Sequence, residues 1–286
     1  VYEENRLRGG RKTRIEECAE LIKFVEEKVL SEEKWSIDSA IGFAKEKELF
    51  TEFVTTKTFY NWVDRGLTKL KNMDLLLKVR RKARKEQPKR RRVLGRSIDE
   101  RPKEVETREE FGHWEGDGIV GKEQKGHLIT LVERLTGIGL LFNVGDKQDG
   151  RIVEVLKYLK EEMGEVFAEI FKSITFDNGS EFARSDIMEN EIKTQVYYAH
   201  PYSSWERGTN ENWNGMVRRY IPKGSSFEKL TDKDMSKISN CINTLPRKRF
   251  GYHTPLDLWK EKISAIINNS NIMLEEHQSA LSFFTP

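Results

Sequence analysis

The spacing of apolar residues changes near Trp114 from the period of helices to that of strands, and this change divides the chain. Upstream, apolar residues recur three or four positions apart with charges between them, most clearly over residues 11–30. Downstream, three short apolar segments follow one another, at 114–120, 127–133 and 138–144. Short segments in immediate succession favour an antiparallel meander. The chain is therefore expected to fold as a helical part followed by a part built on a β-sheet.

The first part, residues 1–77, is predicted to contain three helices. The first spans about Arg11–Leu30, the second follows Ser36, and the third begins near Thr55. Three helices of this length suit a helix-turn-helix bundle whose third helix reaches base edges. The outward-facing residues of that helix would be Lys57, Thr58 and Asn61. A solvated helix in an ordinary three-helix scaffold explains the same pattern, so both interpretations stay open.

A strongly basic stretch follows these helices. Between Lys78 and Arg96 there are eleven Lys or Arg residues and one Glu, so the stretch carries +10 and the rest of the chain −7. Pro88 interrupts any continuous helix, and residues 78–108 are interpreted as a linker. Such a stretch binds nucleic acid by releasing counterions from phosphates, and a solubilising segment is the alternative. The expected DNA contacts here are Arg80, Arg81, Arg84, Lys89, Arg90, Arg91 and Arg92.

Length, cysteines and hydropathy limit the class of protein. At 286 residues the chain is long enough for two domains, given about 100 to 200 residues per domain. Cys18 and Cys241 are far apart and lie in no zinc-binding spacing, so neither a disulfide framework nor a structural metal is indicated. No stretch reaches the roughly 18 apolar residues of a membrane span. A cytoplasmic protein is expected.

The second half alternates between predicted strands and helices. After the three strands come a helix over 151–163, a strand over 171–176, a helix near Asp186, a strand over 194–198 and a helix over about 209–220. This order is similar to the ribonuclease H-like arrangement, a mixed β-sheet flanked by helices in which the first and fourth strands are neighbours. The expected fold class is α+β or α/β, with this domain over 109–262 and a tail over 263–286.

Three carboxylates occupy positions that such a fold would bring together. Asp117 lies in the first strand, Asp177 follows the fourth, and Glu211 lies in the last helix. Carboxylate oxygens bind hard divalent cations, and two such cations can clamp the attacking and leaving oxygens of a phosphodiester. Most of the 47 acidic residues are plain surface charges. The joint placement of these three favours a metal-dependent phosphoryl-transfer site.

Glu115 and Glu206 are the nearest rivals of Glu211 for the third acid. Glu206 falls outside the expected spacing. Glu115 is expected to point to the opposite face of its strand from the other acids. Glu211 is therefore preferred.

Five sequence boxes carry a resemblance to a known family. They are Trp114-Glu-Gly-Asp117, Thr130-Leu-Val-Glu-Arg134, Phe176-Asp-Asn-Gly-Ser-Glu-Phe182, His200-Pro-Tyr-Ser-Ser-Trp-Glu-Arg-Gly-Thr-Asn-Glu-Asn212 and Pro246-Arg-Lys-Arg-Phe-Gly-Tyr252. The boxes resemble those of DDE transposases of the insertion-sequence-thirty family, over roughly residues 114–259.

The resemblance implies an N-terminal helix-turn-helix that binds the terminal inverted repeats of an insertion sequence, followed by a ribonuclease H-like catalytic core. It also implies that Asp117, Asp177 and Glu211 hold two Mg²⁺ ions, for which Mn²⁺ can substitute. Water and then a DNA 3′-hydroxyl would be the nucleophiles, so no covalent protein intermediate is expected. Two element ends must be held together, so a homodimer or higher oligomer on DNA, in the bacterial nucleoid, is expected.

Further residues near the acids are expected to meet DNA. Tyr202 and Trp205 would stack on an unpaired base, although burial in the core is the commoner fate of aromatic residues. Arginine forks suit phosphate geometry. The basic residues expected at phosphates are Arg218, Arg219, Arg247, Lys248 and Arg249. Arg207, like Asn210 and Asn214, is expected to meet DNA or to orient Glu211, and a turn or capping role is the alternative.

Three other classes of protein fit part of the pattern. A retroviral-type integrase would carry an N-terminal zinc module of two His and two Cys, which this sequence lacks. A DNA-binding repressor or catalytically silent relative would grip the element ends without cutting, but all three acids are intact. A nuclease acting on RNA hybrids would share the core and leave the basic linker unexplained.

Overall fold

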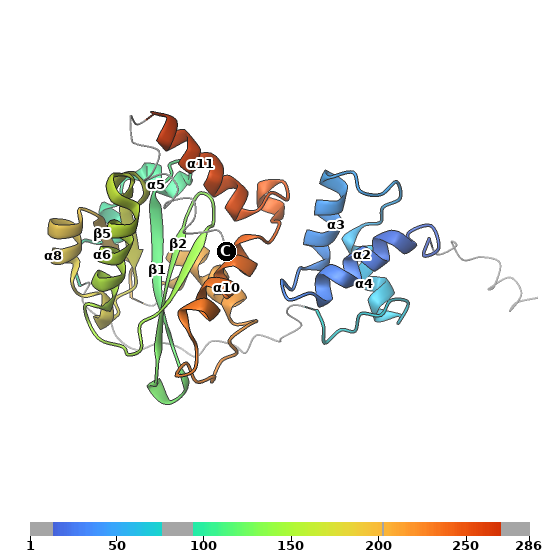
Figure 1. Cartoon of the computed structure of the whole chain (residues 1–286), viewed down its shortest axis with the longest axis horizontal. Coiled ribbons are helices and arrows are strands. Elements are labelled where there is room, and N and C mark those ends of the chain that lie inside the picture. Colours follow the sequence, from blue (N-terminus) through green and yellow to red (C-terminus); the bar gives the residue numbers. More distant parts are fainter. Residues whose placement is uncertain (1–13, 76–93, 202, 270–286) are drawn as a thin grey trace, which may run out of the picture. The chain divides into compact units, whose positions relative to one another are not determined.

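The computed structural model of the chain describes residues 14–75, 94–201 and 203–269 (Figure 1). These residues form two compact units. The first comprises the N-terminal helices and the segment Leu245–His253, and the second comprises the rest of the described chain. The DNA contacts predicted in the basic stretch, from Arg80 to Arg92, lie outside the described residues, and so does Tyr202.

Three helices build the first unit, as the sequence predicts. They are α2 (Ala19–Leu30), α3 (Ile37–Glu46) and α4 (Thr56–Asp64). The Ser36 side chain accepts a hydrogen bond from Ser39 N and caps α3, and Thr55 caps α4 through Thr58 N. Helix α2 starts at Ala19, later than expected, because the preceding residues form turns in which Ala19 N bonds Glu16 O.

The first unit also contains the segment Leu245–His253, which includes the short helix η7 (Lys248–Phe250). The domain boundaries predicted from the sequence assign this segment to the catalytic domain. The Tyr252 ring of this segment packs on Gly42 of α3, where a Cβ atom would lie 1.9 Å from Tyr252 Cε1. Only glycine permits this approach. Arg247, Lys248 and Arg249 therefore sit in the same unit as the predicted DNA-reading helix.

The second unit is built on a five-stranded sheet with the order β3-β2-β1-β4-β5. The strands are β1 (His113–Val120), β2 (His127–Glu133), β3 (Gly139–Asn143), β4 (Ser173–Phe176) and β5 (Gln195–Tyr198). β1, β2 and β3 pair antiparallel, whereas β4 runs parallel to β1 and to β5. The predicted ribonuclease H-like arrangement, with the first and fourth strands adjacent, is confirmed.

Helices cover both faces of this sheet (Figure 1). The longer ones are α6 (Arg151–Met163), α9 (Gly208–Val217), α10 (Asp232–Asn243) and α11 (Pro255–Asn269). Helix α6 packs through Ile152, Leu156 and Leu159 into the core that contains Trp114, whereas α9 and α10 pack on β1, β2 and β3. The last described residues thus continue α11 past residue 262, where the C-terminal tail was expected to begin.

Shorter elements connect these parts. They are η1 (Ile98–Glu100), α5 (Lys103–Thr107), η2 (Lys122–Gln124), η3 (Gly164–Val166), α7 (Phe167–Ile170), η4 (Ser180–Phe182), α8 (Ser185–Ile187), η5 (Met188–Ile192) and η6 (Ser204–Arg207). Residues before η1, assigned by sequence to the linker, run along β5, where Tyr198 N donates to Arg96 O at 2.9 Å. None of the described helices combines the length and apolarity needed to cross a membrane.

The alternation of side chains along β1 decides which residues reach the site. A Cβ atom on Gly116 would lie 2.2 Å from the Phe176 ring, so this position faces the α6 side and must be glycine. Glu115 and Asp117 therefore both face α9, because strand residues two apart share a face. The expectation that Glu115 points away from the other acids is wrong for this reason.

Candidate active site

Asp117 lies within β1, and Asp177 directly follows the adjacent strand β4. Parallel pairing of β1 with β4 aligns Glu115 with Thr175, and two residues further on each strand reaches its aspartate. Asp117 Oδ1 accepts from Gly118 N at 2.9 Å and its Oδ2 accepts from Asn214 Nδ2 at 2.8 Å. Asp177 Oδ1 accepts from Gly179 N at 2.9 Å. Backbone and amide donors thus orient both predicted acids.

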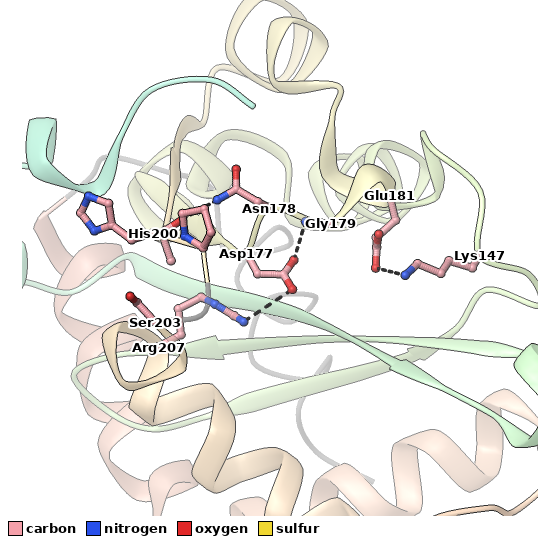
Figure 2. Close-up of a pocket in the computed structure, with 10 residues that line it drawn as sticks. Lys147, Asp177, Asn178, Gly179, Glu181, His200, Ser203 and Arg207 are labelled. Carbon is pink, nitrogen blue, oxygen red and sulfur yellow. Dashed lines mark hydrogen bonds and ion pairs between the residues drawn. The ribbon is translucent and has the colours of Figure 1, made fainter. Parts of the chain in front are cut away.

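One guanidinium lies between these aspartates. Arg207 ends η6, immediately before α9, and is only 6% exposed. Its Nη1 donates to Gly116 O at 3.0 Å and lies 3.4 Å from Asp117 Oδ1, and its Nη2 lies 3.8 Å from Asp177 Oδ2. Figure 2 shows this side chain directed at Asp177. In the structure Arg207 contacts the acidic pair rather than projecting into solvent.

The negative charge of the pair is incompletely offset. Burial raises the pKa of Asp117 above its usual value, the neighbouring charge of Asp177 raises it further, and Arg207 opposes both effects. A carboxylate with a raised pKa is one whose charged form lacks sufficient solvation or counter-charge. A cation placed between the aspartates would supply that charge, and their hard oxygen atoms suit a divalent ion.

Glu211 lies on the same stripe of α9 but does not complete the cluster. It is exposed, and no hydrogen bond or ion pair joins it to either aspartate in the described structure. Residues three apart on a helix are neighbours, so Glu211 lies next to Asn214, which donates to Asp117. Within the described ranges, no three His, Cys, Asp or Glu side chains are grouped so as to hold a metal ion.

Asn210 fixes the start of α9 against the sheet. Its backbone N donates to Glu115 Oε2 at 2.9 Å, and its Nδ2 donates to Glu115 O at 2.8 Å. Its Oδ1 accepts from Thr130 Oγ1 at 3.2 Å. Arg134 Nη1 completes the set with a 2.7 Å ion pair to Glu115. Because all four residues are buried, Asn210 holds the helix that carries Glu211 and is not available to DNA.

A cavity of about 350 Å³ opens beside Asp177 (Figure 2). Asn178 links two of its borders, because its Oδ1 accepts from Leu94 N at 2.9 Å and its Nδ2 donates to Ala199 O at 2.6 Å. His200 lines the cavity, and hydrogen bonds to Glu206 and then Asp99 raise the pKa of its imidazole. Glu206, which was considered as an alternative to Glu211 for the third acid, thus holds His200 in the wall of the cavity.

Sequence reasoning missed a second ion pair at this cavity. Lys147 Nζ lies 3.0 Å from Glu181 Oε1, and both residues line the cavity with Asp177. A Cβ atom on Gly179 would lie 2.6 Å from Glu181 Oε2 and 2.8 Å from Asp177 Oδ1, so the two carboxylates approach each other across a glycine. The presence of Glu181 in the box after Asp177 was a usable signal, whereas Lys147 lies in a loop with no motif.

The remaining predicted DNA contacts are dispersed over both units. On α4, Lys57 and Asn61 are exposed and Thr58 is partly buried. The side chain of Trp205 is 68% exposed, so burial in the core, the alternative considered for it, does not apply. Partial burial lowers the pKa of Arg218. In the first unit Arg247 is partly buried and the two basic residues of η7 are exposed.

No model of a known protein family matches the chain. It is 36% identical over 228 residues to a probable transposase of insertion-like sequence element IS1161 from Streptococcus salivarius, covering 79% of this chain and 64% of that protein. It is 34% identical over 226 residues to the transposase of insertion sequence element IS4351 from Bacteroides fragilis, covering 77% of this chain and 66% of that protein. The transposase InsI of element IS30C from Escherichia coli (strain K12) is 33% identical over 166 residues, covering 58% of this chain and 42% of that protein.

The chain is a relative of the insertion-sequence-thirty transposases. The resemblance drawn from the sequence boxes is thereby confirmed. The chain spans slightly less than two thirds of the first two of these transposases. Among solved structures, the catalytic core domain of BIV integrase aligns with a TM-score of 0.40 at 15% identity, covering 54% of this chain and 97% of that one.

Proposed function

We propose that the chain is a transposase that binds the ends of an insertion sequence and catalyses metal-dependent DNA cleavage and strand transfer. One observation carries the proposal: Asp117 of β1 and Asp177, directly after the adjacent strand β4, are linked through a single guanidinium in a relative of insertion-sequence transposases. Their partly compensated charge suits a divalent cation, and the anchored helix α9 brings Glu211 to the same side of the sheet.

Asp117, Asp177 and Glu211 would hold the two Mg²⁺ ions, or Mn²⁺ in their place. When bound, such ions polarise a phosphodiester and lower the pKa of a water nucleophile. Gly118 N and Asn214 hold the Asp117 carboxylate in place, and Gly179 N holds Asp177. Glu211 would complete the set through a change of its side-chain rotamer, because Asn210 already fixes its helix.

The surrounding basic groups would bind the DNA backbone. Lys147 lines the cavity next to Asp177 and is 42% exposed, so its ammonium can reach a phosphate there. The nucleophile is water in the cleavage step and a freed DNA 3′-hydroxyl in the joining step. No Ser or Tyr of the chain needs to form a covalent intermediate in this reaction class.

DNA recognition would be the role of the first unit and the basic stretch. Lys57, Thr58 and Asn61 lie on one helix whose N-terminus is capped by Thr55. Such a helix can enter the major groove, while the lysines and arginines at 78–96 contribute affinity that is independent of sequence. Two element ends have to be joined, so the active species would be a dimer or larger oligomer.

The proposal is tested by incubating the chain with duplex DNA that carries the sequences flanking its gene, in the presence of Mg²⁺ or Mn²⁺. Asp177→Asn should reduce cleavage and joining by roughly a hundredfold or more, because a metal contributes several kcal/mol to stabilising the transition state. Asp186→Asn is the matched control, since Asp186 is an exposed residue of α8.

Three outcomes would contradict the proposal. Tight binding of the flanking DNA without cleavage at any divalent metal would indicate a DNA-binding repressor or a catalytically silent relative. Cleavage of an RNA–DNA hybrid but not of the duplex would indicate a hydrolytic nuclease. Equal activity of Asp177→Asn and Asp186→Asn would remove Asp177 from the site.

A further inference from the structure

Arg207 occupies the position that a shared cation would need. The two oxygens that face each other across the site are Asp117 Oδ1 and Asp177 Oδ2, and the guanidinium nitrogens of Arg207 lie 3.4 and 3.8 Å from them. Hydrogen bonds orient both carboxylates, since Gly118 N donates to Asp117 Oδ1, Asn214 to Asp117 Oδ2 and Gly179 N to Asp177 Oδ1. A carboxylate oxygen can accept more than one bond, so the two oxygens that Arg207 contacts can still bind a cation.

The contacts of Arg207 with these acids are long. A good charge-assisted hydrogen bond measures about 2.7–2.9 Å, whereas both carboxylate contacts of Arg207 exceed 3.3 Å. Its Nε is buried and finds no hydrogen-bond partner among the described residues. A buried donor without a partner is destabilising. One good hydrogen bond, from Nη1 to Gly116 O at 3.0 Å, holds the guanidinium, whereas its two carboxylate contacts depend on charge attraction, so another cation can replace it at the carboxylates.

We propose that Arg207 is a positioning residue that neutralises Asp117 and Asp177 before metal binds, and that divalent cations displace its guanidinium toward the adjacent cavity to bind a DNA phosphate. The inference rests on the proposed function, because it assumes that these acids bind metal and that DNA enters this site. Arg207 already lines the cavity, where Lys147 provides a second positive group. Metal and DNA would then bind cooperatively, each raising affinity for the other by the same factor.

The first experiment titrates the full chain with Mn²⁺ by calorimetry in the absence of DNA. Arg207→Gln should bind Mn²⁺ about three- to tenfold more tightly than the unaltered chain, tenfold being about 1.4 kcal/mol, because a competing positive charge is removed. Arg207→Lys keeps the charge and should stay close to the unaltered affinity. Arg184→Gln is the matched control, since the exposed Arg184 pairs with Asp149 and is not one of the residues that line the cavity.

The second experiment measures binding of fluorescent duplex DNA by anisotropy, with and without Ca²⁺, an oxygen-binding cation. The unaltered chain should bind DNA more tightly when Ca²⁺ is present. Arg207→Gln should lose most of this gain although it binds the metal ion better. A residue with a merely structural role would not produce opposite effects on metal and DNA affinity.

Equal or weaker Mn²⁺ binding by Arg207→Gln would overturn the inference and leave the proposed function intact. The unaltered chain should bind Mn²⁺, and Asp177→Asn should weaken that binding. If either result is not obtained, the metal site on which both proposals rest is removed. If Arg207→Gln does not fold, ¹⁵N spectra of the unaltered chain decide the question. The guanidinium signal of Arg207 is identified as the one that is absent from the spectrum of Arg207→Lys. This signal should shift when Mg²⁺ is added, and an unchanged signal would contradict displacement of the guanidinium.

Discussion

Replacing Asn210 by alanine should destabilise the second unit by about 2–4 kcal/mol. The side chain donates to Glu115 O at 2.8 Å and accepts from Thr130 Oγ1 at 3.2 Å, with a weaker 3.4 Å contact to Thr130 O. Each good bond contributes roughly 0.5–1.5 kcal/mol net, and a partner left buried without a bond adds about 1–3 kcal/mol. Asn210 is 0% exposed, so water cannot replace the lost contacts. The backbone bond from Asn210 N to Glu115 Oε2 survives the substitution.

Hydrogen exchange followed by mass spectrometry suits this test because it reports the two units separately. Amides of β1 and β2 should exchange faster in Asn210→Ala, by a factor set by the lost free energy, roughly 30-fold or more for 2 kcal/mol or above. Asn212→Ala is the control, since Asn212 lies on the same helix but is exposed, and surface changes are usually within about 0.5 kcal/mol. Equal exchange in the two variants would refute the anchoring role.

Three further predictions concern DNA, the cavity border and pH. Lys57→Ala should weaken binding of element-end DNA and reduce the salt slope of log affinity by about one, measured by anisotropy at several NaCl concentrations. Asn178→Ala should speed amide exchange over 94–101 roughly five- to thirtyfold, because two hydrogen bonds are lost. His200, whose pKa is raised by Glu206, should stabilise the fold below about pH 6.5 and lose that contribution as pH rises through the higher folded-state value. Urea unfolding of the unaltered chain and His200→Gln between pH 6 and 9 should converge at high pH.

Each of these three predictions would be contradicted by a specific result. An unchanged salt slope for Lys57→Ala, with the exposed Lys23→Ala as control, would remove α4 from the DNA interface. Unaltered exchange over 94–101 in Asn178→Ala would show that β5 alone holds that segment. A stability difference between His200 and its Gln variant that grows with pH would reverse the assigned sign.

The strands of the sheet were predictable because each one follows from a local pattern. The short apolar runs over His127–Glu133 and before Asp177 predict strands without knowledge of tertiary contacts. The similarity of the element order to the ribonuclease H-like arrangement then predicted the neighbours of β1 and the meeting of Asp117 with Asp177. The approximate position of Glu211 on a helix follows from periodicity in the same way.

The parts that escaped prediction depend on contacts between distant residues. Asn210 meets Glu115 across 95 positions and Leu94 meets Asn178 across 84 positions, and no local pattern encodes such pairs. The packing of Tyr252 against Gly42 likewise joins a late segment to the first unit. The error at Glu115 has another origin, since the period of two along a strand places it with Asp117.

Glu115 and Asp117 share a strand face and a helix neighbour, yet the structure gives them different chemical roles. Arg134 lies 2.7 Å from Glu115 and both are buried, so Glu115 has a close counter-charge, although Arg134 also lies 3.5 Å from Glu106. Arg207 stands 3.4 Å from Asp117 and divides its charge with Asp177, and the pKa of Asp117 stays raised. A divalent cation gains more from the acid that lacks compensation than from the one that has it. The distance and sharing of the counter-charge, more than the presence of a carboxylate, therefore lead us to expect Asp117 rather than Glu115 as the metal-binding acid in the proposed site.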